Sequence, residues 1–90
     1  MSNAAKFANY DANNPAIYEG FIKYSLELIK AGKTKISAYL IFERMRWEAA
    51  ISVNLDGYKL NNNFRPYYAR KFMEEFPQYA GYFTLRQVAA

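Results

Sequence analysis

The side chains of this 90-residue chain that could do chemistry include eight carboxylates and twelve Lys and Arg, but no histidine and no cysteine. Without imidazoles and thiols the chain cannot form a zinc finger, a disulfide framework, a cysteine nucleophile or a Ser-His-Asp triad. Acid–base catalysis by carboxylates needs two titratable groups directed at one substrate atom. Most carboxylates here instead have a cation three or four residues away, as Glu43 has Arg46, which is the usual pattern of a helix surface.

No glycine-rich phosphate loop and no calcium-loop spacing occurs among the four glycines and the acidic residues. We therefore predict a protein that is not an enzyme and that has neither a metal site nor a cofactor. A metal-dependent nuclease built from Asp and Glu is the enzymatic alternative.

The net charge of +4 points to binding of an anionic partner. Lys33 and Lys35 precede the expected N-terminus of a helix, which is the end that favours anions. Arg65 begins another expected helix, beside three asparagines; Asn and Arg read the edges of adenine and guanine from helices in the major groove. The predicted DNA-binding surface consists of Lys33, Lys35, Arg65 and Arg70 at phosphates and Asn62, Asn63 and Tyr67 near bases. In the structural alternative, the asparagines form a turn and a helix cap, and the lysines only increase solubility.

The aromatic residues, 19% of the chain, suggest a second kind of surface. Most of them fall on apolar helical stripes and are expected in the core, whereas four lie off these stripes: Tyr39, Trp47, Tyr67 and Tyr82. Tyr and Trp are frequent anchors of protein interfaces. The alternative prediction is a module that binds or inhibits another protein through Trp47, Tyr67 and Tyr82. Such a surface would also suit a homodimer.

Three helices are expected to position these residues. Asn14 and Pro15 are typical of a helix start, and Gly32 is a natural stop. Ser37 is a suitable N-cap for the next apolar stripe, and Pro77 ends the last one. The predicted helices span about 15–31, 38–50 and 64–76.

The segments between and after these helices suggest a small antiparallel sheet. Alternating apolar residues and the pair Asp56-Gly57, which favours a type I′ turn, predict a β-hairpin over 51–60. Residues 82–88 are rich in aromatic and β-branched side chains and predict a last strand. The expected fold class is therefore α+β, with three helices and one small antiparallel sheet.

The chain is expected to hold one compact domain over 14–90, preceded by a loose arm over 1–13. This arm shows little periodicity, although Phe7 and Tyr10 could pin it to the domain. No apolar run approaches the roughly 18–20 residues of a membrane span, and the polar start does not fit a signal peptide. We expect a cytoplasmic protein without a membrane partner.

Several strings of residues resemble a family of small, uncharacterised proteins from tailed phages and prophages. The strings are Arg44-Met45-Arg46-Trp47-Glu48, Gly57-Tyr58-Lys59-Leu60-Asn61-Asn62-Asn63, Tyr67-Tyr68-Ala69-Arg70-Lys71-Phe72-Met73, Pro77, Gly81-Tyr82-Phe83 and Arg86. The resemblance covers 14–86 and implies a phage or mobile-element origin, with a role in replication, regulation or host interaction.

The fold that this resemblance implies is a divergent winged-helix or helix-turn-helix domain. About a dozen residues separate the second and third predicted helices, where a standard helix-turn-helix has three or four. The leading expectation is a phage accessory protein that binds DNA through a basic face. The alternative is a module that binds or inhibits a host or phage protein.

Overall fold

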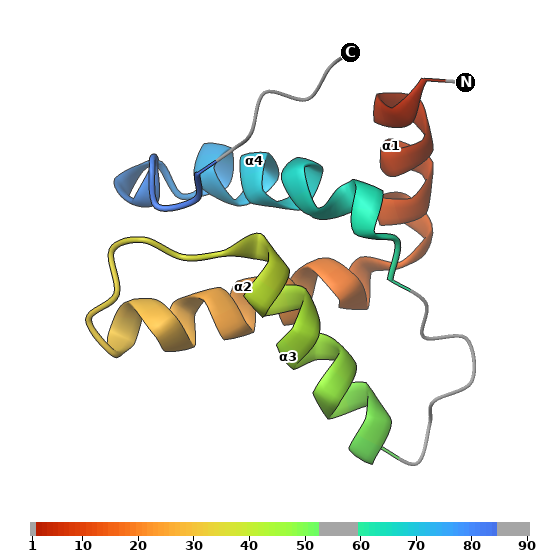
Figure 1. Ribbon diagram of the computed structural model, residues 1–90. Coiled ribbons are helices and arrows are strands. Elements are labelled where there is room, and N and C mark those ends of the chain that lie inside the picture. Colours follow the sequence, from red (N-terminus) through yellow and green to blue (C-terminus); the bar gives the residue numbers. More distant parts are fainter. Residues whose placement is uncertain (1, 53–59, 85–90) are drawn as a thin grey trace.

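The computed structural model describes residues 2–52 and 60–84, and these residues form a helical protein. Figure 1 shows α4 above α2, α3 leading away from α2 at an angle, and α1 standing beside the start of α4. The helices and short 3₁₀ turns are α1 (Asn3–Asn13), α2 (Pro15–Lys30), α3 (Ala38–Ile51), η1 (Asn62–Phe64), α4 (Arg65–Glu75) and η2 (Pro77–Tyr79).

The ends of α2 follow from local sequence. Pro15 occupies the first turn, as predicted, but the Asn14 side chain does not cap α2. Its Nδ2 instead donates to the Tyr10 carbonyl oxygen at 2.9 Å, which satisfies the end of α1. At the other end Gly32 adopts φ +94°, and the Lys33 N–H donates to the Leu28 carbonyl oxygen at 3.1 Å. This is a Schellman motif, which needs a residue that tolerates positive φ.

The core is a cluster of aromatic rings between α2, α3 and α4. Phe21 of α2 is fully buried at its centre, with ring centroids 6.2 Å from Phe42 of α3 and 5.8 Å from Tyr68 of α4. Phe83 closes the cluster at 5.4 Å from Phe21. Because each ring buries about 150–250 Å², a few of them suffice for a small domain. The three helices predicted from the apolar stripes are therefore present, each within a residue or two of the expected bounds.

The predicted antiparallel sheet is wrong. Ile51, the expected first residue of the hairpin over 51–60, is the last residue of α3, because the helix extends further than the alternating pattern suggested. Near the expected last strand, the described residues hold one isolated parallel bridge between Ile36 and Phe83. Residues 53–59 and 85–88 of these two predicted strands lie outside the described residues. Over 2–52 and 60–84 the protein is helical rather than α+β, so the expected fold class is wrong, and these residues contain no strands that could form the wing of the fold implied by the resemblance.

The N-terminal residues form a helix where the sequence predicted a loose arm. Ser2 caps α1, since its Oγ accepts a hydrogen bond from the Ala5 N–H at 3.1 Å. Phe7 packs against Phe64 and Tyr68, with centroids at 5.7 and 4.8 Å, and Tyr10 lies 5.1 Å from Phe64. The helix places only these two rings on the core, which is too few to create a clear periodic pattern in the sequence.

Candidate functional site

The residues predicted to bind DNA lie in three separate places. Lys33 and Lys35 lie between α2 and α3, and Lys35 Nζ is 3.4 Å from the carbonyl oxygen of Gly81, beyond the end of α4. Arg65 lies at the start of α4, at the other end of this eleven-residue helix, which is about 16 Å long. Figure 1 shows the loop that follows α2 and the start of α4 on opposite sides of the molecule.

At the start of α4, the predicted base-reading residues contact other protein groups. The Asn62 side-chain oxygen accepts a hydrogen bond from the Arg46 guanidinium, and the Asn62 carbonyl oxygen accepts one from Arg65 Nε at 3.2 Å. The Asn63 N–H donates to the Asn61 side chain at 2.9 Å. The Arg65 guanidinium lies 5.2 Å from the ring centroid of Tyr39 on α3. These contacts are those of the structural alternative, in which the asparagines form a turn and a cap.

Tyr67 and Arg70 form the third group. Tyr67 stacks on Phe7 of α1 at 5.3 Å, and the Arg70 guanidinium lies 5.9 Å from the Tyr67 centroid. This pair faces α1, whereas Arg65 faces α3. The structure therefore does not bring the seven predicted DNA-binding residues to one surface.

The three aromatic residues predicted for a protein interface are also dispersed. Tyr67 is half-buried against Phe7, and Tyr82 is half-buried with its ring 5.2 Å from Tyr79. Only Trp47 presents most of its surface to solvent, with 66% exposed. Of the predicted interface, Trp47 alone is free to contact a partner.

Trp47 belongs to a different surface, which we call the α3 face and define by Tyr39, Leu40, Trp47 and Ile51. Their exposed fractions are 58, 52, 66 and 67%. Leu40, Trp47 and Ile51 recur at spacings of seven and four, so they line one side of the helix. Ile41, Phe42 and Met45 point the other way into the core, where at most 2% of each is exposed.

Charged residues between the apolar side chains of the α3 face are paired within the protein. Arg44 Nε is 2.9 Å from Glu48 Oε1, and Arg46 is 2.7 Å from Glu43. The hydrogen bond to Glu48 raises the pKa of Arg44 above its usual value, and its guanidinium covers the Tyr24 ring at 4.9 Å. The apolar surface is therefore bordered by charges that are already neutralised.

Leu40 and Ile51 are the residues of this face that sequence reasoning missed. Leu40 lies off the core stripe of its helix, and Ile51 fitted an alternating strand pattern. The signal that could have found them is a second apolar stripe, Leu40, Trp47 and Ile51, on the side opposite Phe42.

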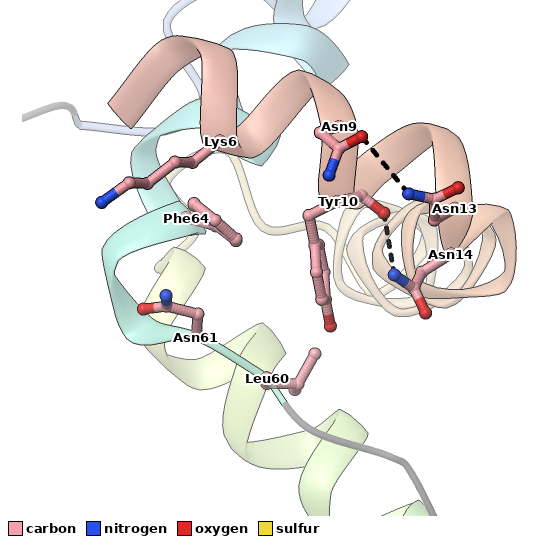
Figure 2. Close-up of a pocket in the computed structure, with 8 residues that line it drawn as sticks. All are labelled: Lys6, Asn9, Tyr10, Asn13, Asn14, Leu60, Asn61 and Phe64. Atoms are coloured by element: carbon pink, nitrogen blue, oxygen red, sulfur yellow. Dashed lines mark hydrogen bonds between the residues drawn. The ribbon is translucent and has the colours of Figure 1, made fainter. Parts of the chain in front are cut away.

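A pocket of about 440 Å³ lies between α1 and η1 (Figure 2). Four asparagines contribute amides to its wall, but Asn13 Nδ2 donates to Asn9 at 3.4 Å and Asn14 bonds to the Tyr10 backbone. Lys6 extends away from the centre of the pocket in Figure 2. Burial raises the pKa of Tyr10 above its ordinary value. The pocket offers hydrogen bonds but no acid–base pair.

A polar cluster joins α1, α2 and α4. Lys71 pairs with Asp11, and its Nζ lies 4.1 Å from the ring centroid of Tyr18. The Tyr18 hydroxyl donates to Glu75 Oε2 at 2.8 Å. Burial, and then this hydrogen bond, raise the pKa of Tyr18, so the phenol is a poor proton donor at neutral pH. The cluster ties three helices together and offers no poised catalytic group.

Among residues 2–52 and 60–84, no three Asp or Glu side chains lie close enough together to hold a metal ion. Within the same residues, no helix has both the length and the apolar character needed to cross a membrane.

The chain matches no protein-family model, no curated protein and no solved structure. The resemblance to phage proteins therefore stays a prediction.

Proposed function

We propose that the protein is a non-enzymatic interaction module that binds a helical segment of another protein through the α3 face. One observation carries the proposal: four large apolar side chains on one helix are each more than half exposed. Large apolar side chains that are exposed together along one helix mark interaction sites more often than ones scattered singly over a surface. Trp and Tyr are also the side chains that most often dominate binding energy at interfaces.

The shape of the surface favours a helical partner. Leu40, Trp47 and Ile51 form a straight ridge along α3, and a second helix can lay its own apolar stripe along such a ridge. Arg65, stacked on Tyr39, adds a positive charge at one end of the ridge. A partner helix with a carboxylate, or with its own C-terminus, at that end would complement it.

DNA binding, the leading expectation from the sequence, has less support. Its predicted contacts divide among three places, and Asn62 and Arg65 already contact Arg46 and Tyr39. The phage resemblance, which stays a prediction, would make the partner a host or phage protein.

The test is selection of a displayed library of helical peptides on the wild-type protein, followed by counter-selection on a Trp47→Glu variant. We expect enriched peptides to carry apolar residues at spacings of three and four. They should bind Trp47→Glu and Leu40→Glu at least ~10-fold more weakly, because a carboxylate then faces the apolar stripe. Gln78→Glu, an exposed position on η2, adds the same charge elsewhere and should leave affinity unchanged.

Circular dichroism and the melting temperature establish that all three variants keep the fold. Failure to enrich any peptide, or enrichment of peptides that bind wild type and Trp47→Glu equally, would overturn the proposal.

A further inference from the structure

We infer that the α3 face is self-complementary, and that two copies of the chain pair through it with their α3 helices antiparallel about a two-fold axis. This inference rests on the proposed function, because the second copy then covers the surface to which the partner helix binds. The site is thereby regulated by protein concentration.

The spacing of residues along α3 supports this pairing. Leu40, Arg44, Trp47 and Ile51 follow one another at intervals of four, three and four, the spacing of the contact positions in a coiled coil. If Leu40 lies opposite Ile51 of a second copy, the same register sets Arg44 opposite Trp47, and two-fold symmetry repeats both contacts. Leu then packs on Ile, and the aliphatic stem of Arg44 packs on the indole while its guanidinium keeps its contacts with Glu48 and the Tyr24 ring.

Charge favours the antiparallel direction over the parallel one. Antiparallel helices place the positive N-terminus of each α3 near the negative C-terminus of the other. Arg65, stacked on Tyr39 near that N-terminus, adds to this attraction. A parallel pair would instead set the two positive N-termini of α3, and the two Arg65 guanidinium groups near them, side by side.

The acidic residues beside the seam do not oppose pairing. Glu43 and Glu48 are each bound to an arginine of their own helix, at 2.7 and 2.9 Å. Neither carboxylate therefore presents an uncompensated charge to the second copy.

The size of the surface predicts a weak and reversible dimer. Two aromatic and two aliphatic side chains, each half to two-thirds exposed, offer roughly 500 Å² per copy. Stable interfaces bury about 800 Å² per partner, so dissociation in the micromolar range or above is expected. A partner helix of higher affinity can displace the second copy. The apparent affinity of the partner helix falls as a larger fraction of the chains becomes dimeric.

The register is tested by cross-linking single-cysteine variants, which is straightforward because the chain has no native cysteine. Leu40→Cys mixed with Ile51→Cys should give a disulfide-linked dimer on mild oxidation. Leu40→Cys alone should not, since the two introduced thiols would lie about 16 Å apart and a disulfide needs Cα atoms within about 7 Å. The matched control is Lys30→Cys mixed with Gln78→Cys, two exposed positions away from α3.

Cross-linking of Leu40→Cys to itself in preference to Ile51→Cys would overturn the antiparallel register. Cross-linking of the mixture no faster than the control pair would overturn the dimer.

Sedimentation equilibrium of the untagged chain provides the second measurement. The average mass should rise from the 10.5 kDa monomer as the concentration increases from about 10 μM to about 1 mM, and Leu40→Glu should stay monomeric. A wild-type protein that is monomeric throughout overturns this inference, while peptides that bind the α3 face would still uphold the proposed function. If the dimer forms in the expected register but the peptide selection enriches no binder, the inference of a dimer holds and the proposed function fails.

Discussion

On α3, the side that packs against α2 and α4 and the side that faces solvent carry apolar residues of similar size. Phe42 and Met45 are 0 and 2% exposed, whereas Trp47 and Ile51 are 66 and 67% exposed. The residue types alone do not separate the two sides. What separates them is whether another helix of the same chain covers that side. One apolar stripe of α3 is buried in the core of the chain, and the other stays exposed because no described helix covers it.

The difference between the two sides of α3 is tested most directly by truncating one aromatic side chain on each side. Phe42→Ala should lower the free energy of unfolding by about 3–5 kcal/mol, because it leaves a cavity beside Phe21 and Tyr68. Trp47→Ala should change it by no more than ~0.5–1 kcal/mol, since most of the indole is in water in the folded and unfolded chain. Urea unfolding followed by far-ultraviolet circular dichroism measures both, because it needs no tryptophan signal.

Phe42→Leu serves if the alanine variant does not fold, and it should lose less stability than the alanine variant because it keeps most of the side-chain volume. A loss above ~2 kcal/mol in Trp47→Ala at low protein concentration would mean that the indole packs within the monomer. The distinction between the two sides of α3 would then be wrong.

Sequence patterns identified the core side of each long helix because burial imposes a 3.6-residue period over many residues. Ile41, Phe42 and Met45 of the predicted second helix follow this period and are buried. The end of α3 was predicted one residue early, and Ile51 was assigned to a strand, because a few alternating apolar residues fit a strand as well as a helix. The aromatic cluster recruits Phe83 through one bridge to Ile36, so a strand-like composition formed no sheet among the described residues.

The candidate site was harder to predict than the core, since it depends on which surfaces remain uncovered. Trp47 was singled out correctly as lying off the core stripe, but Tyr67 and Tyr82 also lay off their stripes and are half-buried. They are covered by Phe7 of α1 and by Tyr79 of η2, contacts that no periodicity within one helix reveals. For the same reason, Lys35 and Arg65 could not be assigned to different places from the sequence.

A second comparison concerns the partly buried hydrogen bond by which Tyr18 of α2 is joined to Glu75 of α4. Tyr18→Phe keeps the ring but removes the hydroxyl that donates to Glu75 at 2.8 Å, so we expect a loss of about 1 kcal/mol at neutral pH. The substitution also removes a pH dependence. Burial and the hydrogen bond raise the pKa of Tyr18 above its ordinary value of 10.0.

Below about pH 10 the phenol is protonated in both states, and its contribution to stability is fully present. Above that pH the unfolded chain loses the proton first, so the free energy of unfolding falls as pH rises. The urea concentration at the midpoint of unfolding is measured at about pH 8 and at about pH 10.5. Between these two pH values it should fall further in the wild type than in Tyr18→Phe. Equal falls in the two proteins would show that Tyr18 titrates alike in both states.

The smallest expected effect on the free energy of unfolding comes from a polar group in the core, the Ser25 hydroxyl. Ser25 of α2 is fully buried, and its Oγ has no hydrogen-bond partner among the described residues. Ser25→Ala removes a hydroxyl that was dehydrated without compensation and adds a better helix former, so the free energy of unfolding should rise by up to ~1 kcal/mol.

The matched control is Ser37→Ala, the same chemical change at an exposed position. The Ser37 Oγ caps α3 by accepting from the Leu40 N–H at 3.3 Å, so its loss should lower stability by about 0.5–1 kcal/mol. The melting temperature should therefore rise in Ser25→Ala and fall in Ser37→Ala, although both variants replace serine with alanine. A lower stability for Ser25→Ala would mean that this hydroxyl is bonded in solution, and that the packed side of the protein contains no uncompensated polar group at this position.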